Sequence, residues 1–208
     1  MKLLIMQPKL ESGLVQLEEE LVKHPEADAI LFPEGYLNEN VKQACHLAHQ
    51  FNKLLIGGHR RLNEQPKDRA IIIDGSGRIL LDRMKYSDTL CVEASGMKIG
   101  HILCDELVLQ GVKGEEAQGA DLLVHPIGVG MFSEEQFEEW TALARQTAIA
   151  SSAFLIGTSH ADGKYRDSEL AIPIAYGFSS QGETLFIAKN DCRSRIVHLG
   201  MQEVSVLE

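Results

Sequence analysis

Short apolar runs of strand length alternate with segments of helical periodicity along this chain, and the alternation occurs twice. The two halves open on the apolar runs Lys2–Gln7 and Met97–Cys104. Each half then reads strand, helix, strand, helix and three further strands. This order favours α/β architecture, because helices that separate strands pack on the faces of a sheet. No Pro/Gly/Ser-rich linker divides the halves, so we predict a single domain of paired sheets over residues 1–208.

The expected elements follow from apolar periodicity and from turn and cap signals. The expected strands are Lys2–Gln7, Ala29–Phe32, Lys53–Gly57, Ala70–Asp74, Ile79–Met84, Met97–Cys104, Asp121–His125, Ala153–Ser159, Ala171–Phe178, Glu183–Ala188 and Arg195–Leu199. The first expected helix carries Leu14, Leu17 and Leu21, with Ser12 as its candidate N-cap. The second carries Val41, Ala44, Cys45 and Ala48, and the third is expected over Glu106–Gln118.

A fourth helix has the clearest signals. Ser133 and Gln136 fit a capping box, and one face of the helix that follows is apolar, with Phe137, Trp140, Ala144 and Ala148. A four-layer α-β-β-α sandwich accommodates this order of elements, with helices outside two packed sheets. A single doubly wound sheet with helices on both faces is the alternative, because periodicity alone does not distinguish the two arrangements.

Composition argues against several classes of protein. The 208 residues include 20 Lys and Arg against 30 Asp and Glu, a formal net charge of -10 that repels nucleic-acid phosphates and anionic lipids. The apolar runs are far shorter than the roughly 18 to 20 residues of a membrane helix, and the amino terminus does not resemble a secretory signal. We therefore expect a cytoplasmic protein with neither a nucleic-acid nor a membrane partner.

We predict that the cysteines are separate free thiols. The chain has four, at Cys45, Cys91, Cys104 and Cys192, with no C-x-x-C pair and no metal-ligand spacing. A reducing compartment keeps such residues as thiols. We expect no bound metal.

Three polar residues lie where predicted strands end, which is where active sites of α/β proteins gather. Glu34 follows a buried strand through Pro33, Lys85 ends the strand Ile79–Met84, and Cys104 lies at a strand-to-helix turn. Each residue taken alone has an ordinary structural explanation. Together they supply a nucleophile, a base for its proton, and a cation for the oxyanion of a tetrahedral intermediate.

These residues stand in the segments LFPEGY, DRMKYSD and GHILCDE. In this order and on these elements, they resemble the three motifs of the nitrilase superfamily, the carbon–nitrogen hydrolases. The resemblance extends from the opening strand, which ends in Gln7, through GADLLVHP at Gly119–Pro126 to about Lys189. It covers most of the chain and implies the four-layer α-β-β-α fold.

The resemblance implies hydrolysis of a non-peptide carbon–nitrogen bond in a small-molecule amide or a related compound. Cys104 would be the nucleophile, Glu34 the general base and later acid, and Lys85 the oxyanion stabiliser. The backbone N–H of Asp105 would be the second oxyanion donor. His125, whose position faces the pocket in the family, could touch the substrate or be a hydrogen-bonded histidine near the core. This chemistry requires neither a metal nor an organic cofactor.

The resemblance also implies a homodimer that pairs through the two helices after the nucleophile. Phe132, Phe137 and Trp140 are the candidate interface anchors, although each aromatic ring could equally be buried within the monomer. His160 could face the substrate or the core, and His101, within the strand that leads to Cys104, is expected to be structural.

Two departures from the family pattern keep other functions open. The segment between Lys85 and Cys104 is short and lacks the family's second glutamate, for which Glu93 is the nearest candidate. Asp105 and Glu106 follow the thiol, and an adjacent anion disfavours a thiolate. One alternative is a catalytically weakened scaffold that binds a ligand or a protein. Another is a flavodoxin-like, cysteine-dependent glutamine amidotransferase, although its Gly-x-Cys-x-Gly turn is absent.

Overall fold

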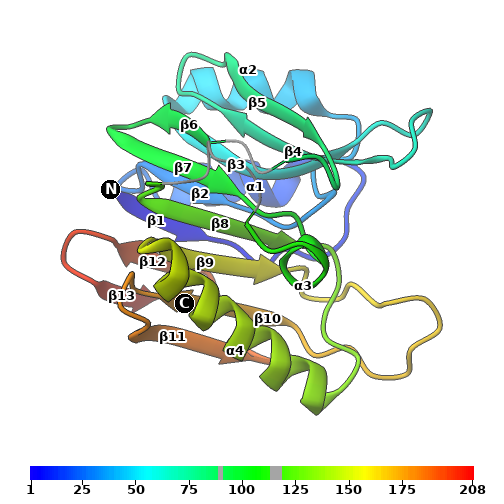
Figure 1. Ribbon diagram of the computed structural model, residues 1–208. Coiled ribbons are helices and arrows are strands. Elements are labelled where there is room, and N and C mark those ends of the chain that lie inside the picture. Colours follow the sequence, from blue (N-terminus) through cyan, green and yellow to red (C-terminus); the bar gives the residue numbers. More distant parts are fainter. Residues whose placement is uncertain (89–90, 113–118) are drawn as a thin grey trace.

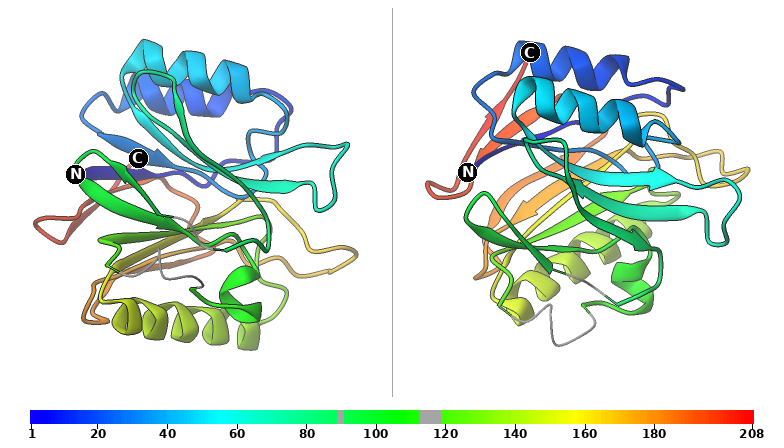
Figure 2. Two further views of the ribbon diagram at one scale, coloured as in Figure 1. Left: turned by 45° about the horizontal axis from the view of Figure 1, so that its top comes forward. Right: turned by 90° about the horizontal axis from the view of Figure 1, so that it is seen from above.

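Two mixed β-sheets lie face to face, and helices cover their outer faces (Figure 1). The structure, a computed structural model, describes residues 1–88, 91–112 and 119–208. Helices α1 and α2 lie on one outer face and α4 on the other, so the layers run α-β-β-α (Figure 2). The predicted four-layer sandwich is confirmed, and the single doubly wound sheet is wrong.

The element bounds show how the chain is divided between the two sheets. In order across the first sheet, the strands are β13 (Glu203–Val206), β12 (Arg195–His198), β1 (Lys2–Ile5), β2 (Ala29–Leu31), β3 (Leu54–Arg60), β4 (Asp68–Ile73) and β5 (Ile79–Met84). Across the second they are β11 (Thr184–Lys189), β10 (Ile174–Phe178), β9 (Phe154–Ser159), β8 (Leu122–Ile127), β7 (Met97–His101) and β6 (Cys91–Ala94). The helices are α1 (Val15–Lys23), α2 (Val41–Phe51), α3 (Glu106–Leu109) and α4 (Glu134–Ser151).

Strand alternation gives each sheet two buried faces. Between the sheets, one apolar cluster takes residues from both, including Leu3 and Ile56 from the first sheet and Val124 and Ile156 from the second. Two further clusters lie beneath the helices on the outer faces. Because the innermost cluster is shared, neither sheet could bury its inner face alone.

Strand direction explains where a site can form. Strands β1, β2 and β3 are parallel, and two antiparallel steps through β4 give β5 the same direction as β3. In the second sheet, β7, β8 and β9 are parallel. Segments that follow β2, β5 and β7 can therefore meet at one end of the sandwich, although they belong to different sheets.

The pairing of the last strands differs from the two-half pattern. The run predicted at Arg195–Leu199 was assigned to the second half, but β12 lies antiparallel to β1 in the first sheet. Strands β6 and β13 were not predicted. Apolar periodicity reports whether a segment forms a strand, whereas its partner is chosen by tertiary packing.

Two helix predictions were wrong in detail. Ser12 does not cap α1. The N-cap residue of α1 is Leu14, and no side chain makes a capping hydrogen bond there. The helix predicted over Glu106–Gln118 ends at Leu109, and Gly111 follows with a positive φ of 61°. Residues 113–118 of that prediction lie outside the described part. Ser133 is confirmed as the N-cap of α4, because its side chain accepts a hydrogen bond from the Gln136 N–H. The reciprocal bond of a capping box is displaced by one residue, since the Gln136 side chain accepts from the Phe132 N–H. Within the described residues, no helix combines the length and apolar character needed to span a lipid bilayer.

His101 joins the two sheets and makes stability depend on pH. It is fully buried on β7, and its Nε2 lies 2.8 Å from the Gly57 carbonyl oxygen on β3. Burial lowers the pKa of His101 to about 3, below its ordinary value of 6.5. The unfolded chain therefore binds more protons than the folded chain between these values, and stability falls as pH is lowered through this window.

We expect His101→Gln to weaken this pH dependence, because a glutamine amide can still donate to Gly57 but does not titrate. Between about pH 7 and about pH 5, the free energy of unfolding should fall by about 2 kcal/mol less in the variant than in the unmodified protein. Urea unfolding at the two pH values measures this difference. Exposed His46→Gln is the control, and equal pH dependence in all three proteins would contradict the assignment.

Candidate active site

Glu34 projects from the end of β2 into the space between the sheets. Its side chain is 8% exposed, and two glycines allow the backbone and carboxyl group to fit there. A Cβ on Gly58 would lie 2.8 Å from Glu34 Cα, and one on Gly128 would lie 2.5 Å from Glu34 Oε2. Larger residues at these positions would displace the carboxylate. His160, fully buried, supports the same segment through Nε2, 3.2 Å from the Glu34 carbonyl oxygen.

Cys104 occupies a strained turn between β7 and α3. Its φ is +51°, a left-handed conformation that non-glycine residues rarely adopt. Its N–H donates to the Pro126 carbonyl at 2.8 Å, and its own carbonyl accepts from His125 Nε2 at 2.7 Å. Strain of this kind persists where surrounding contacts hold it, which is common at catalytic turns.

The side chain of His125 holds this turn through its hydrogen bond to the Cys104 carbonyl. Its Nδ1 lies 2.5 Å from the Tyr176 hydroxyl, and its ring has no exposed surface. Burial lowers the pKa of His125 to about 4, so the ring is neutral near pH 7. We predicted contact with the substrate, but both ring nitrogens are already bonded inside the protein. The position favours a role in holding the backbone of Cys104.

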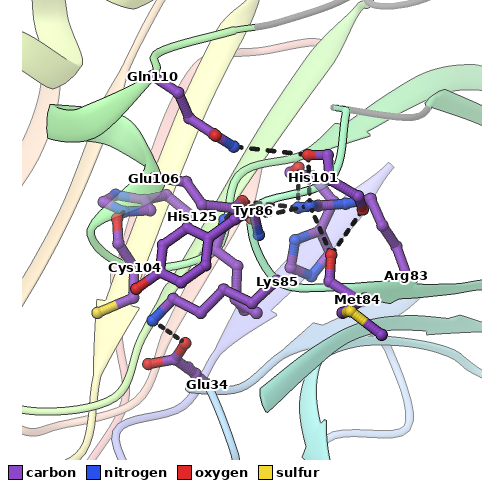
Figure 3. A network of polar contacts seen from close by, with 12 residues as sticks. Glu34, Arg83, Met84, Lys85, Tyr86, His101, Cys104, Glu106, Gln110 and His125 are labelled. Atoms are coloured by element: carbon purple, nitrogen blue, oxygen red, sulfur yellow. Dashed lines mark hydrogen bonds and ion pairs between the residues drawn. The ribbon is translucent and has the colours of Figure 1, made fainter. Parts of the chain in front are cut away.

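Lys85 places its ammonium group between two carboxylates. Nζ lies 2.7 Å from Glu34 Oε1 and 2.8 Å from Asp105 Oδ1, and the Tyr86 hydroxyl donates to Asp105 Oδ2 at 3.0 Å. Figure 3 shows the Lys85 ammonium directed at the Glu34 carboxylate, with Cys104 beside them. Burial alone would lower the pKa of Lys85, but Glu34, Cys104 and Asp105 outweigh burial and raise it above its ordinary value. The lysine is therefore a fixed cation.

The thiol and the carboxyl group at the site are coupled. Burial raises the pKa of Cys104 well above its ordinary value, and Glu34 raises it further, while Lys85 and the Gly128 N–H act in the opposite direction. Burial also raises the pKa of Glu34, opposed by Lys85. Cys104 is therefore a thiol near neutral pH, and it requires a base in order to act as a nucleophile.

Arg83 and Glu106 form a buried bidentate ion pair beside the trio. The guanidinium donates to Glu106 Oε1 at 2.8 Å and to Oε2 at 2.7 Å, and the two side chains are 1% and 0% exposed. Glu106 also accepts from the N–H groups of Tyr86 and Leu103, each at 2.6 Å. Arg83 also donates to the His101 carbonyl at 3.0 Å.

This ion pair connects the elements that carry Lys85 and Cys104. Arg83 precedes Lys85 by two residues, and Glu106 follows Cys104 by two. Sequence reasoning missed the pair, although a signal was present. On β5 the inward-facing positions alternate, so a charged residue at position 83 falls between Leu81 and Lys85 on the buried face. A buried charge needs a partner, and Glu106 was the acidic residue available next to the nucleophile.

The structure corrects the candidate for a second glutamate. Glu93 lies on β6, exposed, and its backbone pairs with Lys98 on β7. It lines a cleft with Asp28 and Asp74, not the site of Cys104. The carboxylate that contacts Lys85 besides Glu34 is Asp105, which we had expected to supply a backbone N–H and to disfavour the thiolate, but not to contact Lys85. Within the described residues, no group of three or more His, Cys, Asp or Glu side chains could hold a metal ion.

Neither a known protein family nor a curated protein matches the sequence. Solved structures do match the fold. A carbon–nitrogen hydrolase from Helicobacter pylori G27 aligns with a TM-score of 0.77 at 16% identity, over 97% of this chain and 90% of its own. An amidase variant from Nesterenkonia sp. AN1, whose active-site cysteine carries the acetamide moiety of fluoroacetamide, gives 0.79 at 13% identity, over 100% and 90%.

A third structure belongs to the same group. XC1258 from Xanthomonas campestris, a CN-hydrolase superfamily protein with an arsenic adduct in its active site, gives a TM-score of 0.72 at 11% identity, over 97% and 92% of the two chains. This chain has the fold of the carbon–nitrogen hydrolases. The fold implied by the three sequence motifs is thereby confirmed, and the flavodoxin-like sheet of the glutamine amidotransferase alternative is wrong.

The Arg83–Glu106 ion pair should matter more for reactivity than for stability. Arg83→Met alone leaves the Glu106 carboxylate buried without its cation, which should lower the free energy of unfolding by about 3 to 5 kcal/mol. Adding Glu106→Leu should restore most of this stability. Alkylation of Cys104 should nevertheless stay about 100-fold slower, because displacing a catalytic group by about 1 Å has an effect of this size.

Urea unfolding and mass spectrometry of each cysteine peptide measure the two effects. Removing the exposed Lys189–Glu134 pair by Lys189→Met and Glu134→Leu is the control, and it should change neither. If the stable double variant at positions 83 and 106 is alkylated at the unmodified rate, the buried pair has no positioning role.

Proposed function

We propose that this protein hydrolyses an amide-type carbon–nitrogen bond of a small molecule through a thioester on Cys104. The observation that carries the proposal is the assembly of Glu34, Lys85 and Cys104 at one end of the sandwich. It places a buried thiol beside a carboxylate and a fixed ammonium group. The fold shared with solved amidases is consistent with this chemistry.

The first half of the reaction forms the thioester. Because Cys104 is a thiol near neutral pH, Glu34 takes its proton as sulfur attacks the amide carbonyl carbon. The carbonyl oxygen becomes an oxyanion, which the ammonium of Lys85 and the backbone N–H of Asp105 stabilise. The intermediate collapses when the carbon–nitrogen bond breaks. Glu34 gives its proton to the leaving nitrogen, which departs as ammonia or an amine.

The second half returns the enzyme to its starting state. Glu34, again a carboxylate, takes a proton from water as the water oxygen attacks the thioester carbon. The same two donors hold the second oxyanion. Collapse breaks the carbon–sulfur bond, releases the carboxylic acid and returns the proton from Glu34 to the Cys104 sulfur. All the groups needed belong to the protein, and Lys85 stays protonated throughout.

Asp105 lies beside the thiol, but its carboxylate also assists the proposed reaction by holding Lys85. Its carboxylate contacts Lys85 and Tyr86. When Glu34 becomes neutral after taking the thiol proton, Asp105 still pairs with Lys85. We infer that this contact keeps the ammonium charged and in place while the oxyanion exists. Asp105 acts on the reaction through Lys85 and is in this respect a positioning residue.

We also propose a homodimer that pairs through α3 and α4. Val108, Leu109 and Phe132 are exposed apolar residues around one groove between these helices. Of the three predicted anchors, Phe132 is 45% exposed, whereas Phe137 and Trp140 are each only 7% exposed and pack inside the monomer. Phe132 is therefore the available anchor among the three.

Turnover of primary amides tests the proposed reaction. We expect ammonia release from at least one member of a panel of small amides, together with an acyl adduct on the Cys104 peptide detected by mass spectrometry. Cys104→Ala should abolish both signals. Lys85→Met should slow ammonia release by about 100- to 1000-fold, the effect of losing one oxyanion donor.

Cys45→Ala is the matched control, because it removes a thiol outside the site, and it should leave turnover unchanged. A folded Cys104→Ala variant that retains full activity would overturn the assignment of the nucleophile. Absence of turnover and of any adduct across the panel would favour the alternative of a ligand- or protein-binding scaffold.

A further inference from the structure

The substrate charge that this site accepts follows from how its own charges are arranged. Lys85 is the cation at its centre, and both of its close partners are carboxylates, Glu34 and Asp105. With both carboxylates ionised, the three side chains carry one excess negative charge. An ammonium held in this way has no free charge to offer to a substrate carboxylate.

Neighbouring cations are also paired. Arg83 is ion-paired to the buried Glu106 carboxylate. Arg60, whose guanidinium packs against Gly35 next to Glu34, is ion-paired to Asp68 with Nε at 3.0 Å from Oδ1. Both arginines therefore already have a carboxylate partner.

Asp105 is the part of this arrangement that meets solvent. Its side chain is 38% exposed, whereas the side chains of Glu34 and Lys85 are 8% and 10% exposed.

We propose that the site accepts uncharged or cationic amides and rejects amides that carry a carboxylate, with Asp105 as the residue that determines this specificity. The proposal rests on the function proposed above and names its substrate class. Rejection is electrostatic, because an anion approaching Cys104 meets an unbalanced carboxylate in a partly desolvated site, where charges interact more strongly than in water. N-substituted amino acids with a free carboxylate are thereby excluded as substrates.

Two alkylating reagents of similar size test this charge preference without knowledge of the substrate. Iodoacetamide is neutral and iodoacetate is anionic, but both react in the same way. Sulfur bonds to the CH₂ carbon, iodide leaves, and the thiol proton passes to Glu34. The measured quantity is the ratio of the iodoacetamide rate to the iodoacetate rate at each cysteine, followed by mass spectrometry at low ionic strength. Cys45, outside the site, is the internal reference.

We expect the ratio at Cys104 to exceed the ratio at Cys45 by about tenfold or more. Added salt should reduce the excess, because the exposed part of the field is screened. Asp105→Asn should also reduce it, even if both absolute rates fall because Lys85 is held less firmly. Asp88→Asn is the matched control, because it removes the same charge from an exposed site three residues after Lys85, and it should leave the ratio unchanged.

The outcomes separate this proposal from the proposed function. If Cys104 is alkylated faster than the other cysteines but shows the same ratio as Cys45, or prefers iodoacetate, the charge preference is wrong and the nucleophile stands. The charge preference is also wrong if Asp88→Asn lowers the ratio as much as Asp105→Asn, because net charge would then explain it. If Cys104 reacts with neither reagent faster than Cys45, the proposed function fails and the inference fails with it.

Discussion

The pairing of one ammonium group with two carboxylates is the interaction on which the site depends. Lys85 is largely removed from water, and a buried cation is tolerated only when anions compensate for its lost hydration. Glu34 from the first sheet and Asp105 from the nucleophile turn provide that compensation. The same contacts that stabilise Lys85 therefore bring together the base, the oxyanion stabiliser and the segment that carries the thiol.

The surrounding structure fixes the relative positions of these groups, which come from two different sheets. The Arg83–Glu106 ion pair joins the end of β5 to the start of α3, and His101 joins β7 to β3. A buried ion pair adds little stability compared with apolar residues of similar volume. Here the ion pair fixes the position of Lys85 relative to Cys104. The two residues follow strands of different sheets, and apolar packing alone would tolerate small shifts between those sheets.

Sequence reasoning identified the features that depend on local pattern. Glu34, Lys85 and Cys104 were found because strands end next to them, and the cap of α4 was found because Ser133 and Gln136 have the required spacing. The pairing of β12 with β1 was not predictable, since an apolar strand fits either sheet. The end of α3 at Leu109 was missed although Gly111, a residue typical of helix ends, follows it.

Side-chain roles within the site were harder to predict than its location. Asp105 was expected to disfavour the thiolate, and the structure indeed shows that it raises the pKa of Cys104. Its contact with Lys85 depends on the turn geometry that brings the two chain segments together. His125 was assigned to the substrate because it ends a strand, but its bonds to Tyr176 and to the Cys104 carbonyl turn it inward. Such choices are settled by three-dimensional neighbours that no spacing rule contains.

The central claim is that Glu34 is the base for the Cys104 thiol, and the pH dependence of Cys104 alkylation tests it most directly. The ordinary pKa values are 4.5 for a glutamate and 9.0 for a cysteine. In the unmodified protein, the rate should rise with pH as Glu34 ionises, with a midpoint above 4.5, because burial raises the pKa of Glu34. In Glu34→Gln this rise should disappear, leaving only an increase at alkaline pH as the thiol itself ionises. Identical profiles for the two proteins would contradict the account.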